Sequence, residues 1–143
     1  MLKQGKSITA LDVAENMLNI TKERVKKSEL DQEKVNYILS DYMEHEFENK
    51  HDAAVVMGFF DYVADPTNVL KKLIRDVNKE IYISVPNNKG VIALFRRLRY
   101  WWNNCPLYLY SRESLEGYLN AAGCLENTEI IEGSRGFFVI IRN

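Results

Sequence analysis

The sequence SITALDVAENMLNITKERVKK, residues 7–27, decides the fold of this chain. Ser7–Asp12 is short and apolar and ends on an acid, which predicts a buried strand. Ala14–Lys27 predicts a helix, because apolar residues recur at helical spacing while charged residues cover the other faces. The positions expected to face the sheet are Ala14, Met17, Leu18, Thr21 and Val25. Val35–Leu39 (VNYIL) predicts a second strand, which completes a strand–helix–strand unit.

The same alternation continues toward the C-terminus. Asp52–Met57 (DAAVVM) is almost wholly apolar, as in a strand that helices cover on both faces. Asp65 and Pro66 predict a helix start, since aspartate caps free N–H groups and proline is tolerated in the first turn. A strand at Glu80–Val85, a helix between Ser111 and Gly123, and strands around Leu125–Ile131 and Phe137–Arg142 follow. The short link Glu132–Gly136 (EGSRG) favours a hairpin.

Strands that alternate with helices imply parallel crossovers. We therefore expect one α/β domain over residues 1–143, with a mostly parallel sheet, helices on both faces and a C-terminal antiparallel hairpin. The 143 residues are 46% hydrophobic and carry a net charge of −1, which indicates no general affinity for nucleic acid. No signal peptide or membrane-spanning run is visible, and the two cysteines fit no metal-ligand spacing. A cytoplasmic protein without a metal is expected.

Five segments carry a family resemblance when they are taken together. They are TALDVAENMLNITKERV, YILSDYMEHEF, FENKHDAAVVMGFFDYVADPTNVLKKL, SRESLEGYLNAAGC and GFFVIIRN. In this order and spacing they resemble the second strand onward of class I, Rossmann-like methyltransferases that use S-adenosylmethionine. The resemblance covers nearly all of the chain. It implies S-adenosylmethionine as the cofactor and a small molecule as the methyl acceptor.

The family's glycine-rich turn, close to G-x-G-x-G after the first strand, has no counterpart in this sequence. Met1–Gly5 (MLKQG) resembles the end of the preceding helix, so the chain matches an N-terminally truncated domain. In the family's strand order, 3-2-1-4-5-7-6, the absent strand is the central one. The strands at Ser7 and Val35 should then not pair with the strand at Asp52. The chain is a fragment, closes its sheet differently or pairs with another chain, and its exposed edges favour self-association.

The expected cofactor-binding residues are Asp12, Val13, Asp41, Tyr42, Met57 and Gly58. A carboxylate at the end of the first strand, Asp12, can accept hydrogen bonds from both ribose hydroxyls. Capping of the following helix is a compatible alternative. The resemblance implies that Asp41 accepts from the adenine amino group, and a simple turn aspartate is the alternative. Val13 and Met17 could pack on the adenine, although core packing is favoured for Met17.

The expected acceptor-binding residues are Phe59, Tyr62, Trp101 and Tyr108. Glycine in Met57–Phe60 (MGFF) allows close backbone approach to a ligand, and a tight strand exit is the alternative. Residues 88–110 combine large aromatic residues with arginines and form a predicted lid. The lid covers a lipophilic or aromatic acceptor, lies on a membrane surface, or is an ordinary helix packed on the core.

The catalytic residues cannot be assigned from the sequence. His45 lies in a charged loop, and His51 precedes a strand and so falls at the wrong edge of the sheet. A base, where the acceptor needs one, is Asp61, Tyr62, Tyr108 or Tyr110, without a ranking. The predicted function is methyl transfer in the intact parent protein, with this chain inactive alone. The rivals are a degenerate fold that binds a partner and, because Asp12 also suits an NAD ribose, an NAD-dependent oxidoreductase.

Overall fold

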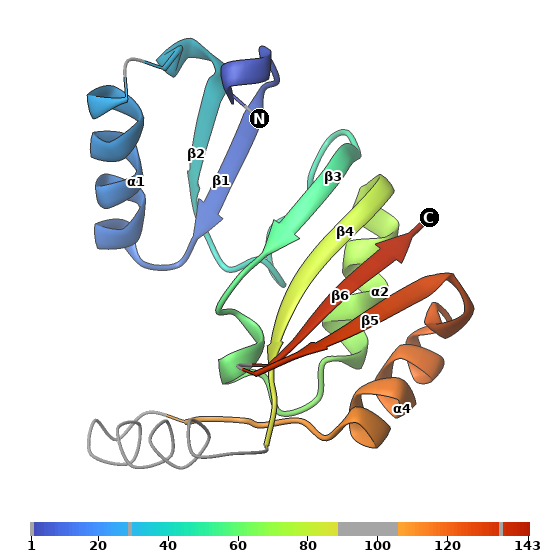
Figure 1. Ribbon diagram of the computed structural model, residues 1–143. Helices are drawn as coiled ribbons and strands as arrows, with labels where there is room; N and C mark the ends of the chain where they lie inside the picture. Colours follow the sequence, from blue (N-terminus) through green and yellow to red (C-terminus); the bar gives the residue numbers. More distant parts are fainter. Residues whose placement is uncertain (1, 29, 89–105, 135) are drawn as a thin grey trace. The chain divides into compact units, whose positions relative to one another are not determined.

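The structure of the chain is a computed structural model that describes residues 2–28, 30–88, 106–134 and 136–143 (Figure 1). These residues form two compact units, Met1–Glu46 and Phe47–Asn143, called the N-terminal and C-terminal units below. A single domain over residues 1–143 stays a prediction. None of the helices in the described part of the chain has the length and apolar character that crossing a lipid bilayer requires.

The N-terminal unit is the strand–helix–strand unit that the sequence predicts. Its elements are η1 (Leu2–Gln4), β1 (Ile8–Asp12), α1 (Glu15–Lys27), η2 (Gln32–Lys34) and β2 (Val35–Leu39). β1 and β2 pair in parallel, from Ile8 opposite Val35 to Asp12 opposite Leu39. The carboxyl ends of both strands therefore lie at the same edge of this small sheet.

The helix and first strand of this unit are less buried than the sequence suggests. Leu18 and Val25 form the buried stripe of α1, whereas Met17 is 51% exposed, so the core role favoured for Met17 is wrong. Every position of β1 is only half-buried, which corrects the expectation of a buried strand. Both differences have one cause. A two-stranded sheet offers α1 a narrow surface, and within the described residues β1 has a neighbour on one side only.

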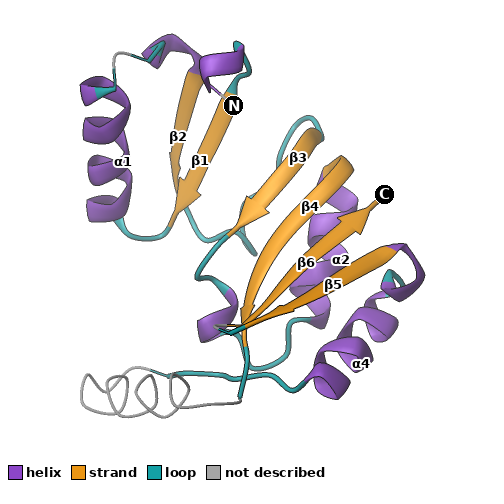
Figure 2. Cartoon of the chain, in the orientation of Figure 1, coloured by secondary structure: helices purple, strands orange, loops and turns teal. Residues whose placement is uncertain are grey.

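The C-terminal unit contains a four-stranded mixed sheet with the order β3-β4-β6-β5 (Figure 2). Its elements are β3 (His51–Val56), η3 (Phe60–Tyr62), α2 (Thr67–Asp76), β4 (Val77–Pro86), α4 (Arg112–Ala122), η4 (Leu125–Asn127), β5 (Thr128–Gly133) and β6 (Gly136–Arg142). β3 and β4 are parallel, while β6 runs antiparallel to both β4 and β5. The α/β fold and the C-terminal hairpin are confirmed.

The two strand orders together equal the expected family order without its central member. In chain order, the six strands correspond to family strands 2 to 7, and the ladders give 3-2 and 4-5-7-6. Among the described residues, no ladder joins β1 or β2 to β3. β3 is therefore an edge strand, and half of its hydrogen-bonding groups face away from β4.

The core of the C-terminal unit lies on one face of its sheet. α2 and α4 contact each other and pack there through buried leucines, among them Leu70, Leu73 and Leu119. The sheet side chains of that face alternate along β4 and β6 and are almost fully buried: Ile81, Ile83, Val85, Phe137, Val139 and Ile141. This alternation is the two-residue period of a strand with one covered face.

The opposite face of this sheet is only partly covered by the described residues. There Tyr82 and Phe138 stack, with their ring centroids 6.2 Å apart and an angle of 27° between the ring planes. Val55 and Ile131 are 52% and 47% exposed on β3 and β5. Register places Val55 opposite Tyr82 and Ile131 opposite Phe138, so these apolar side chains share the face. Among the described residues, helices thus cover one face of this sheet, whereas the sequence predicted helices on both faces.

Local signals place both helices of this unit where the sequence predicts them. The carboxylate of Asp65 accepts a hydrogen bond from the backbone N–H of Thr67 at the start of α2. Ser111 and Ser114 form a reciprocal capping box at the start of α4, and Gly123 closes that helix with a positive φ of 79°. Near the end of α2, Lys72 and Asp76 form a buried ion pair with a Nζ–Oδ2 distance of 3.0 Å.

Candidate functional site

The predicted aspartates of the N-terminal unit lie at the carboxyl ends of its two parallel strands. Asp12 is the last residue of β1, and its Oδ1 accepts a hydrogen bond of 2.8 Å from the backbone N–H of Ala14. This bond turns the chain toward α1. The N-cap of α1 is Ala14 and this helix has no side-chain cap, so the helix-capping role expected for Asp12 is not met. None of the described residues donates to its second carboxylate oxygen. One oxygen thus holds the turn and the other is available to a ligand.

Asp41 lies in the turn after β2. Its Oδ1 accepts from the backbone N–H of Met43 at 2.7 Å, and its carbonyl oxygen accepts from His45 at 2.9 Å. The turn-forming role is therefore present, and adenine binding stays a prediction. The backbone N–H of Ser40 donates to the carbonyl of Asp12, which ties the two strand exits together at 3.2 Å.

The other residues predicted for the cofactor fall in both units. Val13 follows Asp12 directly and is 67% exposed, so its side chain is open to a ligand. Tyr42 is half-buried in the turn after β2. Met57 and Gly58 belong to the C-terminal unit, at the exit of β3. The structure brings Asp12, Val13, Asp41 and Tyr42 together at one sheet edge of the N-terminal unit.

The exit of β3 is a tight turn that glycine makes possible. Gly58 has a φ of 69°, and its N–H donates to the Ser84 hydroxyl of β4 at 3.3 Å. A residue with a side chain would be strained at this backbone conformation. Phe59 is the N-cap of the short helix η3 and is half-buried, while Met57 is 56% exposed. The tight strand exit is therefore present, and close approach of this backbone to a ligand stays a prediction.

Three tyrosines from the segment before α4 and from α4 itself hold η3 in place. The Tyr110 hydroxyl donates to the carbonyl oxygens of Val63 and Phe60. The backbone N–H of Tyr108 donates to the Asp61 carbonyl at 2.9 Å, and the Tyr118 hydroxyl lies 3.5 Å from the Ala64 carbonyl. Burial raises the pKa of Tyr110 well above its ordinary value. Tyr110 is therefore a neutral structural donor.

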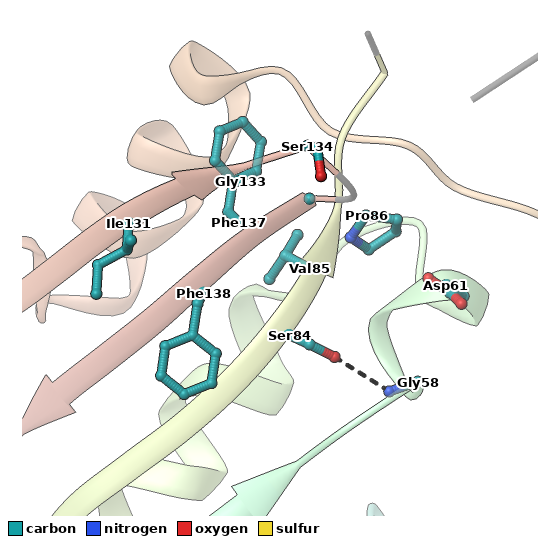
Figure 3. A pocket seen from close by; sticks show the side chains of 11 residues that line it. Gly58, Asp61, Ser84, Val85, Pro86, Ile131, Gly133, Ser134, Phe137 and Phe138 are labelled. Atoms are coloured by element: carbon teal, nitrogen blue, oxygen red, sulfur yellow. Dashed lines mark hydrogen bonds between the residues drawn. The ribbon is translucent and has the colours of Figure 1, made fainter. Parts of the chain in front are cut away.

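A pocket of about 480 Å³ opens at the carboxyl end of β4, between η3 and the β5–β6 hairpin (Figure 3). Its volume lies in the range of small-ligand pockets, roughly 300–1,000 Å³. The lining residues are Gly58, Asp61, Ser84, Val85, Pro86, Ile131, Gly133, Ser134, Gly136, Phe137 and Phe138. Ligands of open α/β sheets bind beyond the carboxyl ends of strands, and this pocket has that position.

Among the described residues, Gly58 and the candidate base Asp61 are the predicted residues that line this pocket. Tyr62 and Tyr108 lie nearby in the chain but are 49% and 39% exposed, and neither lines it. The hairpin residues of β5 and β6 that line the pocket were predicted only as two strands and the link between them, and not as part of a site. One signal could have found them. β6 begins at Gly136 and runs antiparallel to β4, so its first residues must meet the carboxyl end of β4.

Several predictions fall outside this site. Trp101 and most of the predicted lid, namely residues 89–105, lie outside the described residues. His51 begins β3 at the amino edge of the sheet, which confirms that it stands away from the strand exits. Its ring contacts Phe47 edge-on at 4.7 Å. Among the described residues, no group of acidic, histidine or cysteine side chains could hold a metal ion.

Known structures share this fold at low sequence identity. Magnesium protoporphyrin IX methyltransferase (ChlM) from Synechocystis PCC 6803, solved with bound SAH, is 10% identical with a TM-score of 0.71 over 99% of this chain and 65% of that one. The S-adenosylmethionine-dependent methyltransferase SibL is 13% identical with a TM-score of 0.70 over 96% and 43%. The cyclase SpnF is 16% identical with a TM-score of 0.62 over 89% and 44%.

The chain spans between about two fifths and two thirds of the length of these structures. A search of curated protein sequences finds no match. The family model of the methyltransferase domain matches residues 1–83, which is more than half of the chain and includes β1, α1, β2, β3, α2 and most of β4. The chain therefore belongs to the family of methyltransferase domains.

Proposed function

We propose that this chain forms most of an S-adenosylmethionine-dependent methyltransferase domain that acts on a small-molecule acceptor. Family membership and the SAH bound to a protein of the same fold support this proposal. One observation in the chain itself carries it. Asp12 ends β1 with one carboxylate oxygen committed to the turn and the other without a described partner.

The residues at this edge of the N-terminal unit fit the nucleoside end of the cofactor. The uncommitted oxygen of Asp12 suits a ribose hydroxyl, since hydrogen bonds to a charged acceptor are stronger than neutral ones. Val13, which follows Asp12 and is 67% exposed, offers an apolar surface to the adenine ring of the cofactor. Asp41 presents a second carboxylate at the neighbouring strand exit, with its Oδ1 bound to the Met43 N–H.

The cofactor, when bound, supplies a methyl group that its sulfonium has already activated. The protein must then mainly align the acceptor and exclude water. This requirement agrees with a site in which no nucleophile–base pair occurs among the described residues. The pocket beside η3 and the hairpin is the place where the acceptor would be aligned, because it lies beyond the carboxyl end of β4.

A non-catalytic role in partner binding is the second candidate. The sequence lacks the glycine-rich turn that holds the methionine end of the cofactor, so the chain alone should hold only the nucleoside. Among the described residues, β1 and β3 each pair on one side only, and such edges can accept a strand from another chain. Self-association through these edges stays a prediction that light scattering of the purified chain tests.

An NMR titration separates the two candidates. We expect adenosine to shift the amide signals of Asp12 and Val13 in the isotopically labelled chain, with S-adenosylmethionine binding no tighter than adenosine. An N-terminally extended protein that contains the glycine-rich turn should bind S-adenosylmethionine at least tenfold tighter than adenosine. The absence of shifts with either ligand in both proteins would leave the non-catalytic role. Micromolar binding of S-adenosylmethionine by the 143-residue chain would show that another segment replaces the missing turn.

A further inference from the structure

The pocket beside the β5–β6 hairpin has one ionisable side chain among its described lining residues. That side chain is Asp61, and the rest of the lining consists of glycines, two serines, proline and apolar residues. Figure 3 shows Asp61 on η3 and the labelled hairpin residues across the end of β4 from it. A carboxylate on an otherwise weakly polar wall gives the pocket a negative character.

Within the described residues, the carboxylate of Asp61 has no partner, although hydrogen bonds fix its backbone. Among the described residues, none donates a hydrogen bond to it and none forms an ion pair with it. The backbone carbonyl of Asp61, in contrast, accepts from Tyr108 at 2.9 Å, and Tyr110 binds the carbonyl of the preceding residue, Phe60. A fixed backbone with a free carboxylate is the arrangement expected of a group that meets a ligand.

The other candidate bases do not have this position. Tyr110 is buried, donates its hydroxyl to Val63 and Phe60, and has a pKa raised by burial, so it cannot serve as a base near neutral pH. Tyr62 and Tyr108 do not line the pocket. The structure thus ranks four residues that the sequence left equal, with Asp61 first.

We propose that the pocket takes an acceptor whose reacting atom is an amine or hydroxyl, and that Asp61 holds this group and accepts its proton. The proposal rests on the methyltransferase function given above. Methyl transfer to such an atom forms a bond to the methyl carbon, breaks the methyl–sulfur bond of the donor with its electrons left on sulfur, and releases one proton. Asp61 accepts that proton and passes it to solvent.

The rest of the lining defines the acceptor further. Phe138 and Ile131 offer an apolar surface, and the hydroxyls of Ser84 and Ser134 can meet a second polar group. No described lining residue carries a positive charge, so a carboxylate or phosphate near Asp61 would be repelled. The acceptor class is therefore a small, partly apolar molecule that is neutral or cationic at its reacting end.

A binding experiment tests this without the cofactor and without activity. The probes are benzylamine, benzyl alcohol and benzoate, which share a benzene ring and differ in charge. Binding of each probe is measured by NMR from the shifts of the amide signals of Gly58, Gly133 and Gly136. Benzylamine should bind tightest and benzoate weakest. Asp61→Asn should weaken benzylamine binding at least tenfold, whereas Asp65→Asn should leave it unchanged. Asp65 is a matched control, because its carboxylate is committed to Thr67 and lies outside the pocket.

Asp61→Glu keeps the charge and should retain the preference for the amine. A second probe, 4-nitrophenol, reports the proton itself. Its absorbance should show that the bound phenol keeps its proton to higher pH in the unmodified chain than in Asp61→Asn. Three results would each overturn the proposal. They are benzoate binding as tight as benzylamine binding, benzylamine binding that is unchanged in Asp61→Asn, and a bound phenol that ionises at lower pH in the unmodified chain than in Asp61→Asn. Adenosine binding measured on the same samples reports on the cofactor site. A failure of the proposed methyltransferase function can therefore be distinguished from a failure of the proposed role of Asp61.

Discussion

Gly136 lies directly against the backbone carbonyl oxygen of Val85, so closely that a Cβ on Gly136 would overlap that oxygen. The same Cβ would also come within 3.2 Å of the Cα of Pro86. These residues pair where β6 begins beside the end of β4, at the rim of the pocket. Gly136→Ala should therefore force the two strands apart and destabilise the C-terminal unit by about 3 kcal/mol, the cost of overpacking. Urea unfolding followed by circular dichroism measures the change.

Gly117 provides the control for this substitution. It lies inside α4, and a Cβ there meets no atom within 4 Å. Gly117→Ala should stabilise the chain by roughly 0.5–1 kcal/mol, because alanine loses less backbone entropy in a helix. An equal loss of stability in both alanine variants would show that close contact at Val85 is not the cause.

The positions of the helices could be predicted from the sequence, but the burial of their side chains could not. Periodicity, Asp65, the Ser111 cap and Gly123 placed the helices within a few residues, because these signals act within one turn of helix. The exposure of Met17 could not be predicted in the same way. It depends on how many strands lie under α1, which is a tertiary property.

The candidate site divides along the same line. Asp12 and Asp41 could be placed at the exits of their strands from the sequence, because their positions depend only on the adjacent strand. Their part in cofactor binding stays a prediction. The pocket was missed because its walls come from η3, β4 and the hairpin, which only the folded sheet brings together. Asp61 could be named from the sequence as one of four bases, but its rank required knowing which side chains line the pocket.

Tyr110→Phe should cost about 1–2 kcal/mol, since it removes a buried donor and leaves the carbonyls of Val63 and Phe60 without it. Tyr118→Phe is the control. Its hydroxyl lies 3.5 Å from a carbonyl at an exposed site, so the change should stay within about 0.5 kcal/mol. Similar losses in both variants would assign the effect to packing of the two tyrosine rings, whose centroids lie 6.1 Å apart.

The buried hydroxyl of Tyr110 also predicts a loss of stability at alkaline pH. Burial raises the pKa of Tyr110, so the folded chain keeps this proton where the unfolded chain has lost it. The contribution is fully present below the ordinary tyrosine pKa of about 10 and is lost as pH rises above that value. The midpoint of urea unfolding should fall from about pH 10 upward, and less steeply in Tyr110→Phe. A variant with an unchanged slope would assign the alkaline loss to other groups.

Breaking the buried ion pair of Lys72 and Asp76 should strongly lower the free energy of unfolding. Their side chains are 6% and 8% exposed, and Arg75 contacts the other oxygen of Asp76 at 3.0 Å. Lys72→Met should cost about 3 kcal/mol, because a buried carboxylate loses its nearest buried partner. The matched pair on α4, Arg112 and Glu116, is 49% and 41% exposed, so Arg112→Met should cost less than about 1 kcal/mol. Equal costs in urea unfolding would contradict the role of burial.

Asp12 and Asp31 make the sharpest comparison for the proposed cofactor site. Each accepts a hydrogen bond from the backbone N–H two residues later, Ala14 at 2.8 Å and Glu33 at 3.1 Å. Asp12 ends β1, whereas Asp31 precedes β2, so they lie at opposite ends of the same two-stranded sheet. Asparagine keeps the accepting oxygen and hence the turn, so both Asp→Asn variants should fold.

Only the variant at Asp12 should lose affinity for adenosine. Removing the charge weakens a hydrogen bond worth about 1.5–3 kcal/mol, which corresponds to a loss of roughly ten- to 150-fold in affinity. Asp31→Asn removes the same charge from the same unit at the amino end of β2, so it controls for long-range electrostatics. Calorimetry with adenosine on both variants decides the matter. If the two affinities fall equally, the carboxylate of Asp12 acts through net charge and does not touch the ribose; if neither falls, Asp12 is outside the site.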